Sequence, residues 1–414
     1  MLLRNSFRVI VAGGGTGGVT VFYGEQLNHT NAEVVYVDFS TTSMKISQQR
    51  ARFRKLINII WIRTWIEEVR HLGIGLFEQS QCSGVLHHLK TPILGLNILK
   101  GLLTVHGGIN LMVYAEIGRK AVYQIQHILK IMKSTSDIGM FKELKLANHT
   151  LNVLPSNHWF HMRSNIRDHH KYGNIGIYDL LLHKRDVSFS ISSLLQWIGA
   201  GGLHLVDFNS FKTRYRFNIK YYNLGVLFEH KISLLPKLQQ WSISELLLGG
   251  VIKHELFVSK YESSEAKVID QSNQFFLCGN PIGLKEAFFN LKNRMVMRNK
   301  DIFLGTLASI YLPDHSEILT SGGNDSDVIF AIETNPFIVF LMSKILQHPR
   351  GVGLKFAYSQ YRKVSNLTNL SYQKMHALAK LFYDSIKDTG LILLRDISVP
   401  PFPKTSSVAL YYVT

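Results

Sequence analysis

Short apolar runs alternate with helix-like stretches along the chain up to about residue 115. Residues 7–12 (FRVIVA), 32–40 (AEVVYVDFS) and 57–62 (INIIWI) are continuous apolar runs, which is typical of strands buried on both faces of a parallel sheet. Residues 75–84 lead into a fourth strand and 107–115 form a fifth, with helices expected at 41–56 and 91–104. This alternation predicts an α/β fold with a doubly wound sheet.

The alternation stops after Tyr114 and resumes near residue 191. Residues 118–132 have the pattern of an amphipathic helix, whereas 133–190 are polar, rich in histidine and without regular spacing, so we expect an irregular insertion there. Residues 191–208 then predict a helix, a glycine turn and a strand. Residues 253–260 (KHELFVSK) predict one last edge strand.

The length of the chain predicts two domains. Its 414 residues are more than one hydrophobic core usually organises. Because residues 261–273 are polar and have the composition of a linker, we expect a first domain at 1–262 and a second at 263–414. The second domain is expected to be mostly helical, and its helices followed by short strands are typical of a winged-helix-like unit.

Composition restricts the class of protein. A hydrophobic content of 46% with 11% aromatic residues is that of a globular protein and excludes a disordered one. Only two cysteines are present, so a disulfide framework of more than one bridge is excluded, and a reducing, cytoplasmic location is expected. No apolar stretch reaches the roughly 18 uninterrupted residues that a membrane-spanning helix needs.

The net charge of +17 admits two interpretations. Basic residues cluster at 50–55, 211–222 and 292–300, and the second cluster interleaves them with aromatic residues. Such a pattern is compatible with nucleic-acid binding, because a positive field attracts phosphates and aromatic rings stack on bases. The alternative is that these clusters are simply solvated faces of a basic protein.

The segment VIVAGGGTGGVTV (9–21) places a glycine turn between the first strand and the first helix. Glycine lets the backbone approach a ligand closely, and the following helix directs its N–H groups toward an anion or a polar ligand. Gly13, Gly15 and Gly18 fit the dinucleotide pattern G-x-G-x-x-G, but Gly13, Gly15 and Gly17 fit the pattern G-x-G-x-G of S-adenosylmethionine sites. Asp38, at the end of the second strand, could bind the ribose of either ligand. The loop alone therefore leaves both cofactors open.

The segment CSGVLHHLKTPILGLNILKGLLTVHGGINLMVY (82–114) closely resembles the region from the fourth to the fifth strand of class I S-adenosylmethionine-dependent methyltransferases. Together with VAGGGTGG and VVYVDFS, the order and spacing match over residues 7–115, and the elements at 191–208 and 253–260 extend the match. The segment MVYAEIGRKAVYQIQ resembles a subgroup of uncharacterised methyltransferases. The resemblance implies a Rossmann-like methyltransferase domain, S-adenosylmethionine as the cofactor, and an unidentified methyl acceptor (a small molecule, a protein or a nucleic acid).

The resemblance also implies which residues bind the cofactor. They lie at the ends of the first four strands: Gly13, Gly14, Gly15, Thr16, Gly17, Asp38, Phe39, Ser40, Trp65, Ile66, Cys82 and Ser83. The glycines would pack beneath the methionine portion, and Thr16 would lie in the first turn of the helix.

Individual roles follow from the same resemblance. Asp38 would hold the ribose, with Phe39 and Ser40 beside the adenine. Trp65 stands where the family commonly has an acid for the adenine amino group, with Glu67 and Glu68 close behind, and Trp65 and Ile66 could instead flank the ring. Cys82 and Ser83 would border the sulfonium.

No catalytic residue is assigned by the sequence. Methyl transfer depends mainly on alignment of donor and acceptor, but a protonated acceptor needs a base. Candidate bases near the carboxyl edge of the sheet are His87, His88, Tyr114 and Glu116. We expect one of the two adjacent histidines to pack internally and the other to face the site. A metal site built from Cys82 and these histidines is not expected, because the spacing matches no known ligand motif.

Several departures from the family pattern keep other functions open. Glu78 replaces the usual aspartate, and Lys120 stands where the subgroup has a small or polar residue. Family members generally have a helical portion before the first strand, which implies that this chain is a divergent or truncated copy. The alternatives are a catalytically inactive scaffold with a methyltransferase fold, a nicotinamide-dependent oxidoreductase, and a nucleic-acid-binding protein without catalysis.

Overall fold

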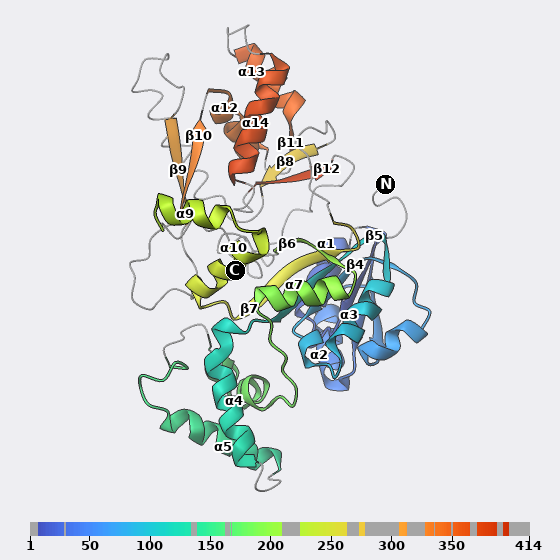
Figure 1. Cartoon of the computed structure of the whole chain (residues 1–414). Helices are drawn as coiled ribbons and strands as arrows, with labels where there is room; N and C mark the ends of the chain where they lie inside the picture. The colour runs from blue at the N-terminus through green and yellow to red at the C-terminus, as the bar shows by residue number, and fades with distance from the viewer. Residues whose placement is uncertain are drawn as a thin grey trace. The chain divides into compact units, whose positions relative to one another are not determined.

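The structure is a computed structural model of the whole chain (Figure 1). It describes residues 7–28, 30–133, 139–161, 166, 168–208, 224–262, 273–277, 306–312, 328–334, 336–348, 351–364, 371–386 and 392–396. The described residues divide into two compact units, one within 7–262 and the other within 273–396. We call the first the sheet unit, whose described residues run from Phe7 to Glu262, and the second the C-terminal unit.

The sheet unit is built on seven strands in the order β3-β2-β1-β4-β5-β7-β6. Strands β1 to β5 are mutually parallel, whereas β7 is antiparallel to both β5 and β6. The strands are β1 (Arg8–Ala12), β2 (Glu33–Asp38), β3 (Ile59–Arg63), β4 (Phe77–Ser83), β5 (Leu103–Tyr114), β6 (His204–Phe208) and β7 (Lys253–Ser259). The predicted doubly wound sheet is confirmed. The prediction of an edge strand at 253–260 is wrong, since β7 pairs on both sides and β6 is the edge.

Helices cover both faces of this sheet, as Figure 1 shows. Side chains alternate along β1: Val9 and Val11 pack on one face with residues of α1 and α2, and Ile10 packs on the other with Ile98 of α3. Because both faces are covered, apolar residues are favoured at successive positions of β1, β2 and β3, which explains the continuous apolar runs there. The helices that follow β1 to β6 are α1 (Gly18–Leu27), α2 (Thr41–Phe53), η1 (Ile66–His71), η2 (Leu86–His88), α3 (Pro92–Gly101), η3 (Ile117–Arg119), α7 (Ile191–Ala200), α9 (Val226–Ser233) and α10 (Lys237–Leu248).

Residues between β5 and α7 form a helical insertion rather than an irregular one. It contains α4 (Lys120–Lys133), α5 (Met140–Val153), α6 (Asp168–Ile177) and the π-helical turn η4 (Tyr178–Leu182), and α4 and α5 lie beside each other in Figure 1. The prediction of an irregular segment at 133–190 is therefore wrong. The helical pattern was missed because few of its positions are apolar. Those positions, such as Ala147 and Leu151, pack in a separate small core with Ile125 and Leu129, and polar residues occupy most of the others.

The described parts of the C-terminal unit combine sheets and helices. Strand β8 (Asn273–Leu277) pairs antiparallel with β11 (Val352–Gly353) and β12 (Ile392–Asp396), and β9 (Thr306–Leu312) pairs antiparallel with β10 (Val328–Thr334). Helices α12 (Pro336–Gln347), α13 (Leu354–Val364) and α14 (Tyr372–Ile386) bury residues such as Met342, Ala357 and Phe382. Since much of 263–414 lies outside the described residues, the winged-helix-like arrangement stays a prediction.

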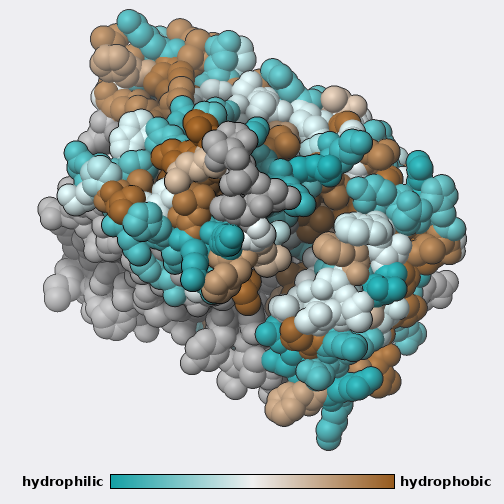
Figure 2. Space-filling model, turned by 90° about the horizontal axis from the view of Figure 1, so that it is seen from below, coloured by the Kyte–Doolittle hydropathy of each residue, from teal (hydrophilic) through white to brown (hydrophobic). Residues whose placement is uncertain are grey.

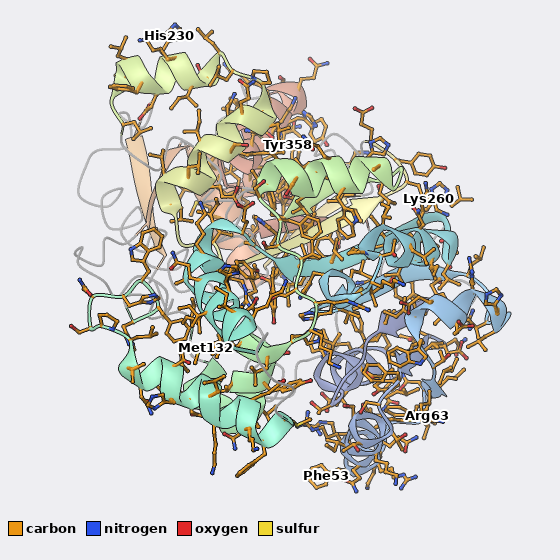
Figure 3. The ribbon with its side chains drawn as sticks, turned by 60° about the horizontal axis from the view of Figure 1, so that its bottom comes forward. Phe53, Arg63, Met132, His230, Lys260 and Tyr358 are labelled. Atoms are coloured by element: carbon orange, nitrogen blue, oxygen red, sulfur yellow. The ribbon has the colours of Figure 1, made fainter. Side chains whose placement is uncertain are left out.

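The surface of the described residues is mixed. On the face shown in Figure 2, hydrophobic side chains are scattered among hydrophilic ones. Phe53, at the end of α2, is an example: it is 85% exposed and points away from the sheet (Figure 3). Of the helices in the described part of the chain, none combines the length and the apolar character required to cross a membrane.

Candidate functional site

The glycine loop connects β1 to α1 and has three residues in the left-handed region. Gly13, Gly15 and Gly17 have φ angles of 77°, 51° and 90°, which L-residues other than glycine rarely adopt. Gly17 caps α1, which begins at Gly18. Thr16 therefore precedes the helix cap instead of lying in the first turn, and its carbonyl accepts a hydrogen bond from Arg50 at 3.0 Å.

The surroundings of each glycine distinguish the two sequence patterns. A Cβ at Gly14 would collide with Tyr36, and one at Gly17 would collide with Ser47 of α2, so close packing requires both glycines. A Cβ at Gly15 or Gly18 would meet no heavy atom of the described residues within 4 Å. Gly18 also has no unusual φ. The left-handed φ angles thus mark the three glycines of G-x-G-x-G, at 13, 15 and 17, whereas Gly18, the third glycine of G-x-G-x-x-G, has neither an unusual φ nor a close neighbour among the described residues.

Asp38 lies at the carboxyl end of β2 and faces this loop. Its Oδ2 accepts a hydrogen bond from the Gly15 amide and its Oδ1 accepts one from the Ser40 amide, both at 2.8 Å. The hydroxyl of Tyr36, a buried residue of β2, donates a hydrogen bond to the Gly15 carbonyl at 2.8 Å, and this bond holds the loop against the sheet. A carboxylate offers about four lone-pair sites, so these two amides orient Asp38 and leave acceptor capacity for a diol such as a ribose.

Aromatic rings lie beside Asp38 at the ends of β2 and β3. Phe39 and Trp65 stack on each other with ring centroids 4.2 Å apart and an angle of 6° between the planes, and each is 56% exposed. Ser40 caps α2 by accepting a hydrogen bond from the Ser43 amide. Ile66, in contrast, is buried in the core, so only its backbone could contact a ligand at this edge.

Cys82 and Ser83 end β4 but differ in accessibility. The Cys82 side chain is fully buried, and burial raises the pKa of its thiol to about 12. In the protein as described this thiol stays protonated at neutral pH, so it is a poor nucleophile. Ser83 is partly exposed and its hydroxyl accepts a hydrogen bond from the Gln81 amide at 2.8 Å. Of this pair, Ser83 alone presents a side chain to the carboxyl edge of the sheet.

A second group of polar residues lies at the ends of β4 and β5. We call it the His–Asp cluster, and its members are His87, His88, Tyr114, Arg119, His183 and Asp186. The rings of His87 and His88 have centroids 4.1 Å apart, as do those of His87 and Tyr114, and the His88 and His183 rings are 3.7 Å apart. The Arg119 guanidinium lies 3.6 Å above the Tyr114 ring.

Burial controls the protonation of these histidines. His87 is fully buried, and this burial, together with neighbouring His88 and Arg119, lowers its pKa to about 2. Burial also lowers the pKa of His88, against a hydrogen bond from its Nδ1 to the Arg185 carbonyl at 2.7 Å. At neutral pH His87 is therefore uncharged, and it is a poor general base.

Asp186 and Arg119 form a buried ion pair behind the histidines. Arg119 Nη2 lies 3.6 Å from Asp186 Oδ2, and the two side chains are 4% and 2% exposed. The side-chain amide of Gln126 donates to the same oxygen at 3.2 Å. Sequence analysis identified neither Asp186 nor His183, because both belong to a segment without periodic spacing. The short run HKRD (183–186), which places an acid among basic residues, was the available signal.

The remaining candidates are less concentrated. Tyr114 donates a hydrogen bond to Asp179 at 3.4 Å, and Glu116 contributes its backbone amide to the Phe189 carbonyl at 2.9 Å. Within the basic cluster 50–55, the Arg50 side chain donates a hydrogen bond to the Thr16 carbonyl and Arg54 pairs with Glu25 at 3.0 Å, so both side chains have partners within the sheet unit. The basic clusters at 211–222 and 292–300 lie outside the described residues.

Comparison with known sequences finds limited similarity. No protein-family model matches the chain. Among curated proteins, the uncharacterized protein syc1184_c of Synechococcus sp. is 26% identical over 255 residues, which is 61% of this chain and 60% of that protein. The matched region thus spans less than two thirds of this relative.

Comparison with solved structures identifies the fold. PKMT2 from Rickettsia typhi matches with a TM-score of 0.61 and 13% identity, covering 95% of this chain and 72% of PKMT2. The structure of PKMT2 in complex with AdoHcy has the same TM-score and identity, covering 94% of this chain and 71% of PKMT2. At this identity the likeness shows the fold, which is a divergent, Rossmann-like fold of the class I methyltransferase type. The resemblance found in the sequence is confirmed at this level.

Proposed function

We propose, from this fold, that the chain is an S-adenosylmethionine-dependent methyltransferase that binds its cofactor at the carboxyl ends of β1 and β2. One observation carries the proposal: the loop at Gly15 presents bare backbone to open space, next to the oriented carboxylate of Asp38. The left-handed glycines at the three positions of G-x-G-x-G favour this cofactor over a dinucleotide, and the AdoHcy complex of PKMT2 agrees with it.

The residues present fit such a cofactor in chemical terms. The side chain of Asp38 would accept hydrogen bonds from the ribose hydroxyls, while the glycine loop would lie against the methionine portion. Phe39 and Trp65 offer an exposed aromatic surface for the adenine. When bound, S-adenosylmethionine supplies an electrophilic methyl group on a sulfonium. The protein then needs only to align the acceptor, exclude water and take up a proton.

The methyl acceptor in this proposal is a small molecule, a protein or a nucleic acid. The net charge of +17 favours an acidic partner. Among the candidate bases, Tyr114 and His88 retain partly exposed side chains at the carboxyl edge, whereas His87 is buried. We assign the reaction to the cytoplasm on the basis of the cysteine content alone.

Calorimetry on the full chain tests cofactor binding. We expect S-adenosylhomocysteine to bind and NAD not to bind. Asp38→Asn should weaken S-adenosylhomocysteine about 10-fold or more, because hydrogen bonds to a charged acceptor are roughly twice as strong as neutral ones. The matched control is Glu33→Gln at the opposite end of β2, which should leave the affinity unchanged. Preferential binding of NAD would instead support an oxidoreductase.

Transfer is tested separately from binding. Radiolabelled S-adenosylmethionine is incubated with the protein and a cell extract, and the labelled product is treated with nuclease or protease. Sensitivity to one of these enzymes identifies the acceptor as nucleic acid or protein, and resistance to both indicates a small molecule. Cofactor binding without transfer to any fraction would support the inactive scaffold.

A further inference from the structure

The His–Asp cluster contains the donor set of a metal site. One ring nitrogen each of His87 and His88 and one carboxylate oxygen of Asp186 lie within 4.8 Å of one another. Ligands about 2.1 Å from a common ion at tetrahedral angles lie about 3.4 Å apart. Side-chain movements of about 1 Å would therefore bring these three atoms to coordination distance.

His87 gives the first independent indication of a ligand. Its side chain is fully buried, and neither Nδ1 nor Nε2 has a hydrogen-bond partner among the described residues. A buried polar group without a partner is unfavourable, because it has lost its hydrogen bonds to water without replacement. A metal ion would satisfy one of these nitrogens directly.

The other two donors are already held as metal ligands usually are. The Nδ1–H of His88 donates to the Arg185 carbonyl at 2.7 Å, which leaves Nε2 unprotonated and available. On Asp186, Gln126 and Arg119 occupy Oδ2, whereas Oδ1 is buried and has no partner among the described residues. Each donor therefore keeps one atom for an ion while its other atom is fixed by a neighbouring group.

We infer that His87, His88 and Asp186 bind one divalent first-row transition-metal ion, such as Zn²⁺. Imidazole and carboxylate donors without a thiolate favour ions of this group. The three ligands come from η2 and from the segment that follows η4, which are far apart in the sequence. The ion would therefore tie the helical insertion to the end of β4, and a fourth coordination position is left for His183 or a ligand from solution.

Binding of Zn²⁺ to the full chain, freed of metal with a chelator, tests the inference. Calorimetry should show one site per chain. Asp186→Asn and His88→Gln should each weaken this site at least 10-fold, since each removes a ligand. The matched control is His127→Gln, an exposed histidine on α4 of the same insertion, which should leave the affinity unchanged.

A second measurement on the unmodified chain covers the case in which these variants fail to fold. X-ray absorption at the zinc edge of the one-to-one complex should show nitrogen and oxygen ligands at about 2.0–2.2 Å, with two imidazoles, or three where His183 is the fourth ligand, and no sulfur. The inference is overturned if the chain binds no stoichiometric zinc, if both folded variants bind as tightly as the unmodified chain, or if the spectrum shows sulfur ligands. None of these outcomes depends on the methyltransferase activity.

Discussion

The glycine loop and the His–Asp cluster lie at the same edge of one sheet but are built in opposite ways. The loop is backbone: its three left-handed glycines come from five consecutive residues, and Asp38 completes it from the adjacent strand. The cluster is built from side chains: it assembles histidines, a tyrosine, an arginine and an aspartate from η2, the end of β5, η3 and the segment after η4. The loop is open to a ligand, whereas the side chains of His87, Arg119 and Asp186 in the cluster are buried.

The residue types at the two regions are therefore restricted by different physical properties. In the loop, backbone conformation and close packing restrict the residue type, so few alternatives to glycine exist. In the cluster, charge and hydrogen bonding restrict it, because a buried ion is costly unless it is paired. Mutations should consequently destabilise the two regions for different reasons and by different amounts.

Removal of Arg119 should have the largest effect on stability. Arg119→Met keeps most of the apolar stem over the Tyr114 ring but removes the charge that pairs with Asp186. Breaking a buried ion pair by removing one partner costs about 3–5 kcal/mol, because the other charge remains buried. We expect a loss of this size in the free energy of urea unfolding, measured on chelator-treated protein.

The neighbouring residue provides the control for this prediction. Lys120 is exposed, so Lys120→Met should change the free energy of unfolding by no more than about 0.5 kcal/mol. If Arg119→Met and Lys120→Met were equally mild, the Arg119–Asp186 pair would contribute nothing, and the contrast between the two regions would be lost.

Gly17→Ala should have the next largest effect. Alanine at φ 90° is strained by about 1 kcal/mol, and its Cβ would collide with Ser47, which adds an overpacking cost of about 1–3 kcal/mol. We therefore expect a loss of about 2–4 kcal/mol in thermal or urea unfolding.

Gly18→Ala is the matched control one residue further along the same loop. Gly18 has no unusual φ and a Cβ there meets nothing within 4 Å among the described residues, so the unfolding free energy should stay within about 0.5 kcal/mol or rise slightly. Equal costs at the two positions would contradict the assignment of G-x-G-x-G as the pattern that this loop requires.

Tyr36→Phe should lower the free energy of unfolding by a smaller amount, because it removes one hydrogen bond between the core and the glycine loop. The Tyr36 hydroxyl donates to the Gly15 carbonyl, and the substitution removes this bond without changing the ring. One hydrogen bond contributes about 0.5–1.5 kcal/mol to stability. A loss of this size, with a weaker affinity for S-adenosylhomocysteine, is expected from calorimetry.

The exposed Tyr261 offers a control for the loss of a hydroxyl. Tyr261→Phe should change neither the stability nor the affinity. If Tyr36→Phe left the affinity for S-adenosylhomocysteine unchanged, the loop would keep its conformation without the hydrogen bond from Tyr36.

The sequence allowed the sheet and the loop to be predicted because both depend on local patterns. Continuous apolar runs reflect two covered faces, as at Val34 to Val37, and a positive φ restricts the residue to glycine at 13, 15 and 17. The His–Asp cluster could not be predicted in the same way. His183 and Asp186 join His87 only after the helical insertion folds, and nothing in their local spacing distinguishes them from solvated residues.

The position of β7 escaped prediction for a related reason. Its alternating burial, with His254 and Leu256 inside, is equally compatible with an edge strand and an inner antiparallel one. The choice depends on pairing with β5 and β6, which are distant in the sequence. Both wrong predictions, the edge strand at 253–260 and the irregular segment at 133–190, therefore concern structure that depends on contacts between residues distant in the sequence.

The smallest predicted effect concerns the stacked rings of Phe39 and Trp65. Both rings are 56% exposed, so the stack adds little burial, and aromatic pairs contribute about 0.5–1.5 kcal/mol beyond their buried area. A double-mutant cycle with Phe39→Ala and Trp65→Ala should give a coupling free energy of unfolding in the lower half of this range. In the same variants the free energy of S-adenosylhomocysteine binding should fall by more than the free energy of unfolding, because the exposed rings are the proposed contacts of the adenine. If the coupling free energy were large and the cofactor affinity unchanged, Phe39 and Trp65 would stabilise the fold, as the buried residues of the His–Asp cluster do, and would not bind the cofactor.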